Sequence, residues 1–171
     1  SILAFFLLGS LTASETDYYL AEGGSDGKNG ISWETAWRTI SNAVANTTDD
    51  DVILVSNGVY DVAREIAVTN AVTLRGVWGR SATVVRRSGT DAYRLFTVGN
   101  SNALLEELTV CNGSAVNGGA VWLSAGTLRD CSVVSNNYGG GSGGGVYATG
   151  GAILGCDVRA NYNVNGGGLC L

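Results

Sequence analysis

The chain contains no histidine, no proline and no methionine, and Lys28 is its only lysine. Without histidine, a Ser–His catalytic triad and most zinc sites are excluded. Basic residues number 10 against 15 acidic ones, and the net charge of -5 argues against a nucleic-acid partner, which requires a basic surface. Flexible linkers usually carry proline, so we assign the 26 glycines to tight turns and close backbone contacts.

Composition indicates a packed chain, since hydrophobic residues make up 45% and charged residues 15%. A length of 171 residues suits one domain or part of a longer array. The 4 cysteines are scattered and do not have the spacing of a disulfide framework or a zinc site. No cofactor is indicated by any motif.

The first 14 residues resemble the back half of a secretory signal peptide, truncated before its apolar segment. The run Ile2–Leu8 is followed by small and polar residues through Ser14, which favours cleavage near Ser14 and Glu15. The run is shorter than the roughly 20 residues of a membrane-spanning helix, so no transmembrane span is predicted. A buried strand or an N-terminal helix is the alternative. We therefore expect a secreted or cell-surface protein, with association to an outer membrane left open.

Residues 15–50 are predicted to form a short strand and a capping helix. Tyr18–Leu20 has the pattern of a strand, and the turn-rich segment Glu22–Gly30 follows it. Ser32 can serve as the N-cap of a helix that runs to about Asn46. The apolar face of this amphipathic helix is spaced by four, three and four residues and consists of Trp33, Trp37, Ile40 and Val44.

Residues 51–171 carry a repeat that indicates a solenoid. Three similar motifs occur: GGAVWL at Gly118–Leu123, GGGVYA at Gly143–Ala148 and GGGLCL at Gly166–Leu171. The first two begin 25 residues apart and the last two 23 residues apart. A period of this length, made of short strands with glycines between them, is typical of coils that bury their apolar faces by stacking. Because the chain stops inside the third motif, we expect further coils to follow.

Short apolar runs from Val52 onward, separated by turn residues, indicate strands without intervening helices. This pattern excludes βαβ units. The repeat in a fixed register favours parallel stacking over a hairpin sandwich, which would show two-residue turns. The predicted fold class is therefore all-β, a right-handed parallel β-helix with an N-terminal amphipathic capping helix.

Four segments together resemble secreted right-handed parallel β-helix proteins of the pectin-lyase-like type. They are residues 18–44, the run DVILVSNGVYD, the run AVTLRGVWG and the glycine-led motifs. Within that group the chain is similar to β-helix repeat proteins and to polymorphic outer-membrane or autotransporter-like passengers of bacteria. The resemblance implies that the helix plugs the N-terminal end of the solenoid. It leaves function open, because this fold carries lyases, hydrolases and adhesins alike.

In a stacked solenoid, equivalent residues form columns, and alternation assigns each column to the inside or the outside. Cys131 and Cys156 are predicted to stack inside, either as a buried thiol ladder or as a disulfide. Cys111 and Cys170 fall at outward positions in different columns. The paired inward residues are predicted to be Leu108/Val110, Cys131/Val133, Cys156/Val158, Val121/Leu123, Val146/Ala148 and Leu169/Leu171.

Two outward or corner columns are candidates for contact with a ligand. Trp122 and Tyr147 share an outward position and would form a flat platform for sugar rings, or a ladder that packs only on itself. Asn136 and Asn161 share a corner position, where stacked amides satisfy backbone groups. We expect these two asparagines to be structural, with ligand contact as the alternative.

The acidic residues give no catalytic constellation. Glu107 and Asp130 align, but the third coil has Gly155 at that position, and Arg129 and Arg159 fall in different columns. Asp26 and Asn29 in the SDGKNG loop supply too few oxygens for a calcium site, which takes six to eight. No catalytic or metal-binding residue is therefore predicted.

The sequence favours an exported, non-catalytic β-helix scaffold, adhesin-like or in contact with a polysaccharide or cell-surface glycan. The first alternative is a polysaccharide lyase or glycoside hydrolase whose active site lies on coils outside this sequence. The second alternative is a structural stalk.

Overall fold

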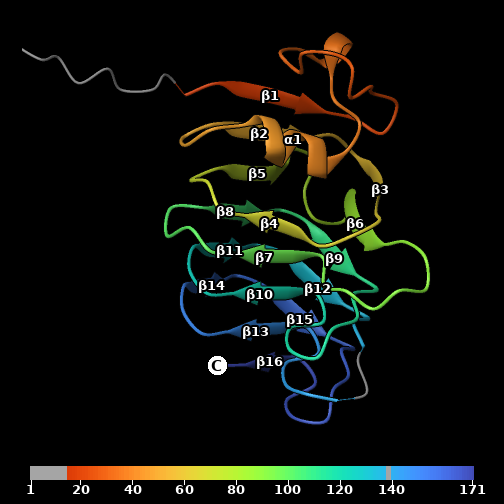
Figure 1. Ribbon diagram of the computed structural model, residues 1–171, viewed down its shortest axis with the longest axis vertical. Helices are drawn as coiled ribbons and strands as arrows, with labels where there is room; N and C mark the ends of the chain where they lie inside the picture. The colour runs from red at the N-terminus through yellow and green to blue at the C-terminus, as the bar shows by residue number, and fades with distance from the viewer. Residues whose placement is uncertain (1–14, 138–139) are drawn as a thin grey trace, which may run out of the picture.

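Three parallel sheets form the walls of the molecule, which is a parallel β-solenoid as predicted (Figure 1). The computed structural model describes residues 15–137 and 140–171. Sheet A contains β1 (Asp17–Leu20), β2 (Val52–Val55), β5 (Thr73–Gly76), β8 (Leu104–Glu106), β11 (Thr127–Arg129) and β14 (Ala152–Leu154). Sheet B contains β3 (Gly58–Val62), β6 (Thr83–Arg87), β9 (Thr109–Cys111), β12 (Ser132–Val134) and β15 (Asp157–Arg159). Sheet C contains β4 (Ile66–Val68), β7 (Phe96–Val98), β10 (Val121–Leu123), β13 (Val146–Ala148) and β16 (Leu169–Cys170).

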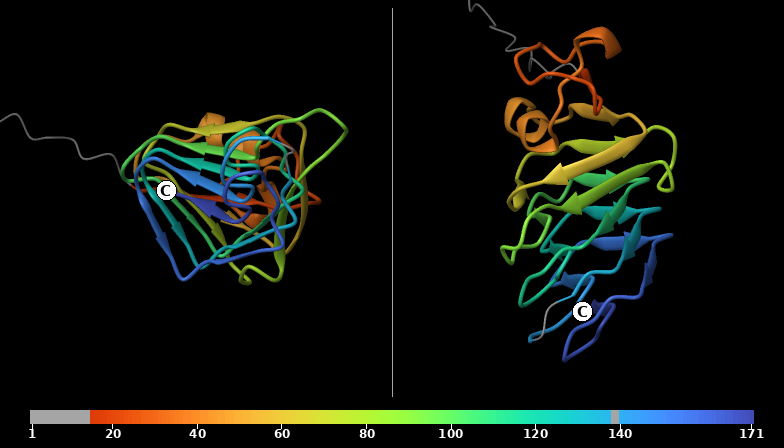
Figure 2. Two further views of the ribbon diagram at one scale, coloured as in Figure 1. Left: turned by 90° about the horizontal axis from the view of Figure 1, so that it is seen from below. Right: turned by 90° about the vertical axis from the view of Figure 1, so that its right-hand side faces the viewer.

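Each coil contributes one strand to each sheet, so successive coils stack in register. Seen along the axis, the three sheets enclose one interior (Figure 2). Leu74 pairs with Leu105, which pairs in turn with Leu128, and all three side chains are fully buried. Such columns of branched apolar side chains are the core, and each coil relies on its neighbours to bury its own share.

The inward alternation predicted from the repeats holds for the middle coils. Leu108, Val110, Val121, Leu123 and Val133 are all fully buried. Leu169 and Leu171, which were also predicted to face inward, are instead 38% and 89% exposed. They belong to the last coil described, so one side of that coil has no neighbouring coil to cover it.

The corners between sheets are made by residues in the left-handed conformation. Between sheets A and B these are Glu107, Asp130 and Gly155, with φ of 56°, 51° and 61°. Between sheets B and C they are Asn112, Ser135 and Ala160, with φ of 61°, 56° and 52°. Glu107 and Asp130 share this left-handed conformation at the same corner, so their alignment in the sequence reflects corner geometry.

The N-terminal cap differs from the single helix predicted over Ser32–Asn46. Ser32 caps only the short 3-10 helix η1 (Trp33–Thr35), while the α-helix α1 (Ile40–Asn46) begins after its own N-cap, Thr39. Between them the chain extends, and the Trp37 N–H donates to Tyr19 O at 2.9 Å. The free edge of β1 therefore takes this segment as a partner, and the energy of edge pairing overrides the helical periodicity.

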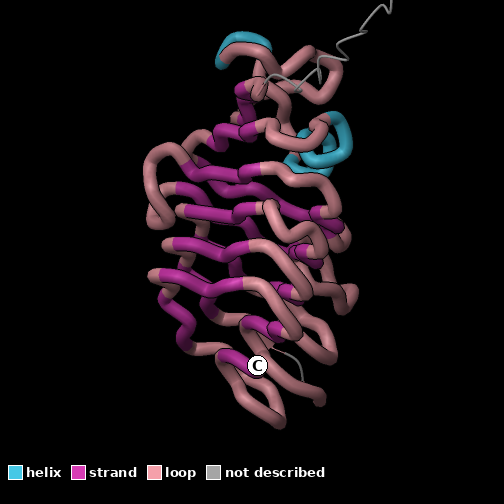
Figure 3. Tube along the Cα trace, turned by 90° about the vertical axis from the view of Figure 1, so that its left-hand side faces the viewer, coloured by secondary structure: helices cyan, strands magenta, loops and turns pink. Residues whose placement is uncertain are grey.

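The cap still covers the N-terminal end of the solenoid. The α1 helix lies against this end of the solenoid (Figure 3), where it contacts β1, β3 and β4 and buries Ile40 and Val44 against the core. Trp33, in contrast, is 43% exposed. The Trp37 ring stacks on Tyr18 with centroids 4.8 Å apart. The predicted capping helix is thus confirmed in position, but it is shorter than predicted. Two residues of its predicted apolar face, Trp33 and Trp37, lie before α1.

The SDGKNG loop has a structural role in this cap. The Asp26 carboxylate accepts hydrogen bonds from the Arg38 and Thr39 N–H groups at 2.8 and 2.9 Å, and from Thr39 Oγ1 at 2.7 Å. Partial burial raises the pKa of Asp26, but these hydrogen bonds outweigh it and hold the pKa below its ordinary value. The loop is thereby tied to the start of α1.

Over the described ranges no helix has both the length and the apolar character to cross a bilayer. The predicted signal peptide, residues 1–14, lies outside the described residues.

The repeated glycine pairs have two distinct purposes. The first glycine of each pair adopts a positive φ, as at Gly118, Gly143 and Gly166 (63°, 62° and 65°). The second permits close stacking of the corners: a Cβ at Gly119 would lie 2.2 Å from Gly144 O, and one at Gly144 would lie 2.4 Å from Gly167 O. The repeated motif is therefore a condition for the coils to approach one another.

We predict that Gly144→Ala destabilises the protein by about 2–3 kcal/mol, because the added methyl overlaps backbone that cannot move without separating two coils. Gly23→Ala is the matched control, since nothing lies within 4 Å of the added Cβ. Urea unfolding followed by circular dichroism measures both. Equal effects of the two substitutions would contradict the stacking role.

Candidate functional site

The outer face of sheet C carries the aromatic column predicted from the repeats. Thr97, Trp122, Tyr147 and Cys170 occupy equivalent outward positions on β7, β10, β13 and β16. They point outward because Val121, Leu123, Val146 and Ala148 on the same strands point into the core. The structure thus brings Trp122 and Tyr147 together on one exposed face.

The two rings are tilted and do not form a flat platform, which was one of the two arrangements expected for this column. Their centroids lie 6.3 Å apart and their planes are inclined by 58°. Trp122 is 37% exposed, and its Nε1 lies 3.4 Å from Thr149 Oγ1 in the next coil. A planar ligand would therefore stack on one ring at a time, with the other ring beside it.

A charged pair, Glu65 and Arg94, lies next to this column and was not predicted from the sequence. The Arg94 guanidinium lies over the Trp122 ring, 5.0 Å from the centroid, and its Nε is 3.6 Å from Glu65 Oε2. Thr97 Oγ1 donates to the same carboxylate. The Nε and Nη1 of Arg94 are buried without a hydrogen-bond partner. Because Glu65 and Arg94 are 29 residues apart in the chain, only the stacking of coils places them together.

The Arg94 contact restrains the Trp122 ring. A desolvated cation–π contact contributes on the order of 2 kcal/mol, and the Arg94 side chain is only 15% exposed. Arg94 holds the indole from one side, and 37% of Trp122 remains exposed. An aromatic face that is already restrained loses little entropy when it takes a ligand.

The loops between sheets B and C lead into the strands of this face, and an asparagine ladder supports them. The buried Asn136 amide donates to Val110 O at 3.1 Å and to Asn161 Oδ1 at 2.9 Å, and its Oδ1 accepts from Gly113 N at 2.8 Å. Asn161 Nδ2 donates to Val133 O at 2.8 Å. The two asparagines satisfy corner backbone groups and leave no polar atom of Asn136 free for a ligand.

Cys131 and Cys156 lie one above the other inside the corner between sheets A and B. Both are free thiols; Cys131 is fully buried, and Cys156 is half-buried against the edge of the core. The neighbouring Cys156 thiol and burial raise the pKa of the Cys131 thiol. The neighbouring Cys131 thiol lowers the pKa of Cys156 to about 7, although burial opposes this.

The outward cysteines lie on different walls. Cys111 is on β9 of sheet B, and burial raises the pKa of its thiol. Cys170 is on β16 of sheet C, next to Tyr147 in the column. The structure does not bring these two together.

An ion ladder on the outer face of sheet A was also missed by sequence reasoning. Arg75, Glu106 and Arg129 are in register on β5, β8 and β11, and both arginines bond the Glu106 carboxylate, Arg129 Nε at 2.8 Å and Arg75 through its own Nε. Burial raises the pKa of Glu106, but hydrogen bonds from the two guanidinium groups overcome this and hold the pKa below its ordinary value. Arg129 therefore has an aligned acid, which is Glu106 and not Glu107.

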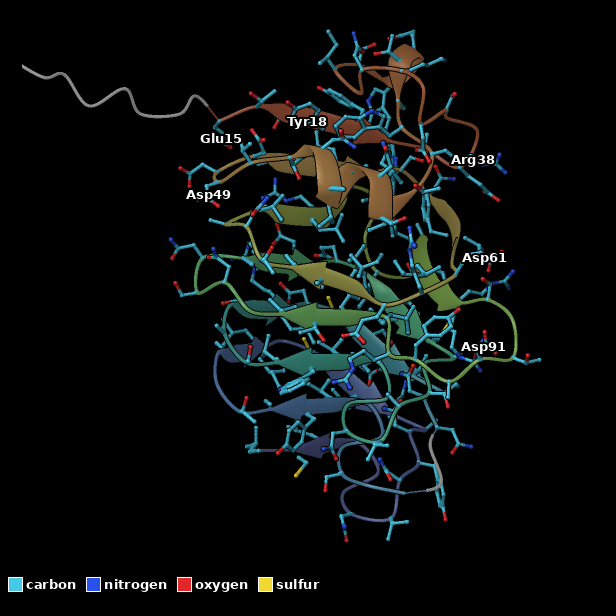
Figure 4. The ribbon with its side chains drawn as sticks, viewed as in Figure 1. Glu15, Tyr18, Arg38, Asp49, Asp61 and Asp91 are labelled. Atoms are coloured by element: carbon cyan, nitrogen blue, oxygen red, sulfur yellow. The ribbon has the colours of Figure 1, made fainter. Side chains whose placement is uncertain are left out.

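A cavity of about 460 Å³ lies between the cap and β3. Glu22, Asp26, Arg38 and Asp61 are among its lining residues, and Figure 4 shows Arg38 and Asp61 along the same edge of the molecule. Asp26 is already bonded to the start of α1, and Asp61 pairs with Arg86 at 2.6 Å. Among residues 15–137 and 140–171, no group of three or more metal-ligating side chains is found here or elsewhere.

Comparison with known proteins identifies the fold. No family model matches the chain, and no curated protein sequence matches it. Solved structures match over most of its length, with the pectin-lyase-like β-helix fold. The pectate lyase Pel9A superposes with a TM-score of 0.56 at 15% identity, over 84% of this chain and 48% of that one. A rhamnogalacturonan lyase gives 0.54 at 17% identity, over 88% and 43%.

A third similar structure is the pectin methylesterase PemA from Erwinia chrysanthemi, with a TM-score of 0.53 at 19% identity, over 89% of this chain and 57% of that one. This chain therefore spans about half the length of the solved structures it resembles. At these identities the likeness establishes the fold, and the predicted pectin-lyase-like architecture is confirmed.

We predict that Glu106→Gln lowers stability by about 2 kcal/mol at pH 7, because two guanidinium groups lose their buried carboxylate. Since the pKa of Glu106 is lowered in the folded state, its contribution is present above the ordinary carboxyl pKa and is lost as the pH falls through the folded value. The difference from the wild type should thus shrink as the pH falls below the ordinary pKa of a glutamate. Unfolding in urea at pH values on both sides of that pKa is the measurement.

Asp61→Asn is the control for this ladder. Its pair with Arg86 is exposed, with side chains 52% and 46% accessible, so its loss should cost under about 0.5 kcal/mol. A pH-independent defect in Glu106→Gln would mean that packing, and not the ion ladder, explains the loss.

Proposed function

We propose that this protein binds polysaccharide on the outer face of sheet C, with Trp122 as the principal contact. The observation that carries the proposal is the exposed Trp122 indole, restrained by Arg94 and flanked by Tyr147. The C–H faces of a sugar ring are apolar, and they pack on an aromatic face while the ring hydroxyls reach outward to water and polar side chains. A glycan chain has such faces at regular intervals along its length.

The charges near Trp122 fit contact with hydroxyl groups. Glu65 balances Arg94 at 3.6 Å, so this pair has no net charge. The Thr97 and Thr149 hydroxyls lie along the same strands or at their ends. We therefore expect binding that depends weakly on ionic strength, since exposed charge attraction is what salt screens.

The solved structures of the same fold support a polysaccharide ligand. They are named as acting on pectate, rhamnogalacturonan and pectin. The fold and the exposed aromatic face together support a polysaccharide ligand, because a fold alone does not imply function.

We further propose that the protein is exported and acts as an adhesin-like module that holds glycan without turnover. The apolar run Ile2–Leu8 and the small residues after it support export. On the described face of sheet C, the acid Glu65 is already engaged by Arg94 and Thr97, which supports a binding role.

A polysaccharide lyase or esterase is the second candidate, favoured by the activities named for the structural neighbours. The two candidates differ in their products. Incubation with polygalacturonate, methylated pectin and rhamnogalacturonan, followed by assays for unsaturated ends, reducing ends and methanol, detects an enzyme. Retention on immobilised glycan with no product in any assay supports the binding module, and sustained turnover would replace it.

We predict that Trp122→Ala weakens glycan binding at least about tenfold, which corresponds to about 1.4 kcal/mol of lost ring contact. Isothermal titration or a glycan array measures the affinity, and thermal unfolding verifies that the variant is folded. Trp122→Phe should retain part of the affinity, because it keeps an aromatic face.

Trp78→Ala is the matched control, since Trp78 is 69% exposed but lies in the loop between β5 and β6, away from sheet C. It should bind as the wild type does. Unchanged binding by folded Trp122→Ala would disprove the role of this face.

A further inference from the structure

Cys131 and Cys156 occupy the same corner position one coil apart. Pairing of Arg129 with Leu154 precedes them and pairing of Ser132 with Asp157 follows them, so the register is unbroken across the two cysteines. Neighbouring strands lie about 4.8 Å apart, and this separation is within the Cα–Cα range of about 4.4–6.8 Å found for disulfides. Both are free thiols, and each sulfur donates to backbone carbonyls: Cys131 Sγ to Arg129 O at 3.3 Å and Cys156 Sγ to Leu154 O at 3.4 Å.

The surroundings give the two thiols different reactivity. Cys131 is fully buried, while Cys156 is half-buried and is the more exposed of the two in this structure. Arg80 Nη1 donates to Gly155 O at 3.1 Å and lies 3.5 Å from Cys131 O, so it joins the backbone of the two coils at this corner. The neighbouring Cys131 thiol lowers the pKa of Cys156, while burial and the Asp130 carboxylate oppose this.

We propose that Cys131 and Cys156 are an oxidation site that closes to an inter-coil disulfide when the protein meets a disulfide oxidant. The Cys156 thiolate attacks one sulfur of oxidised glutathione, and one glutathione thiolate leaves. The Cys131 sulfur then attacks the Cys156 sulfur, and the Cys131 proton passes to the second glutathione sulfur, which leaves as a thiol. Two electrons pass from the cysteine pair to the oxidant, which becomes two thiols.

The neighbouring Cys156 thiol and burial both raise the pKa of Cys131, so its proton leaves only as the second glutathione sulfur takes it up. Cys111 and Cys170 lie on different sheets and cannot compete as partners.

The crosslink would join two successive coils at the corner that follows β11 and β14 of sheet A. It would close a loop of 25 residues, from position 131 to position 156. Such a closure restricts the unfolded chain, so the oxidised protein should melt at least about 5 °C above the reduced one. An oxidising compartment, as proposed for an exported protein, supplies the conditions.

The test uses the full chain with Cys111→Ser and Cys170→Ser, which retains only the proposed pair. After incubation with oxidised glutathione, alkylation under denaturing conditions should find both remaining thiols lost, and the intact mass should fall by two hydrogens. Cleavage after Tyr147 separates the cysteines in sequence, so the fragments should stay joined until reductant is added.

Two results would overturn the proposal: both thiols still open to alkylation, or a glutathione adduct that never resolves. Cys131→Ser is the complementary variant and should stop at the adduct on Cys156. Should that variant fail to fold, the Cys111→Ser, Cys170→Ser protein still decides the question alone.

Discussion

Backbone hydrogen bonding between successive coils is the interaction on which every other feature of this protein depends. Each strand pairs in parallel with its equivalent in the neighbouring coil, on both sides except at the two ends of each sheet. A single coil exposes its apolar residues and both of its strand edges, so it has no stable form alone. The in-register stack converts a sequence repeat into columns of identical neighbours.

Close stacking places specific demands on the corners. The second glycine of each repeated motif lies where a Cβ would overlap the backbone of the next coil, as at Gly144. Asn136 occupies another corner and satisfies backbone groups of two coils with one amide. The cap obeys the same rule at the N-terminal end, since the extended segment at Trp37 pairs with the free edge of β1. Glycine and asparagine therefore specify the spacing that the apolar columns require.

The same stacking brings together the charged and aromatic side chains on the outer faces of sheets C and A. Glu65, Arg94 and Trp122 come from three coils and meet on sheet C, and Arg75, Glu106 and Arg129 meet in the same way on sheet A. One column presents an open aromatic ring, and the other is closed by mutual ion pairing. Inside the corner, Cys131 and Cys156 meet for the same reason. Function in this fold is thus a property of columns, and each column takes one residue from each coil.

The sequence by itself determined the solenoid, the inward and outward alternation and the columns of Trp122, Tyr147, Cys131, Cys156, Asn136 and Asn161, because these follow from a repeat with a nearly constant period. The same repeat aligns Glu106 with Arg129. Only the tertiary structure decided the pairing of Arg94 with Glu65 and of Arg75 with Glu106, since irregular loops shift the register before the repeat begins. It also decided the tilt of the Trp122 and Tyr147 rings, which depends on side-chain packing. The break between η1 and α1 was decided likewise, because the edge of β1 competed for backbone that would otherwise continue a helix.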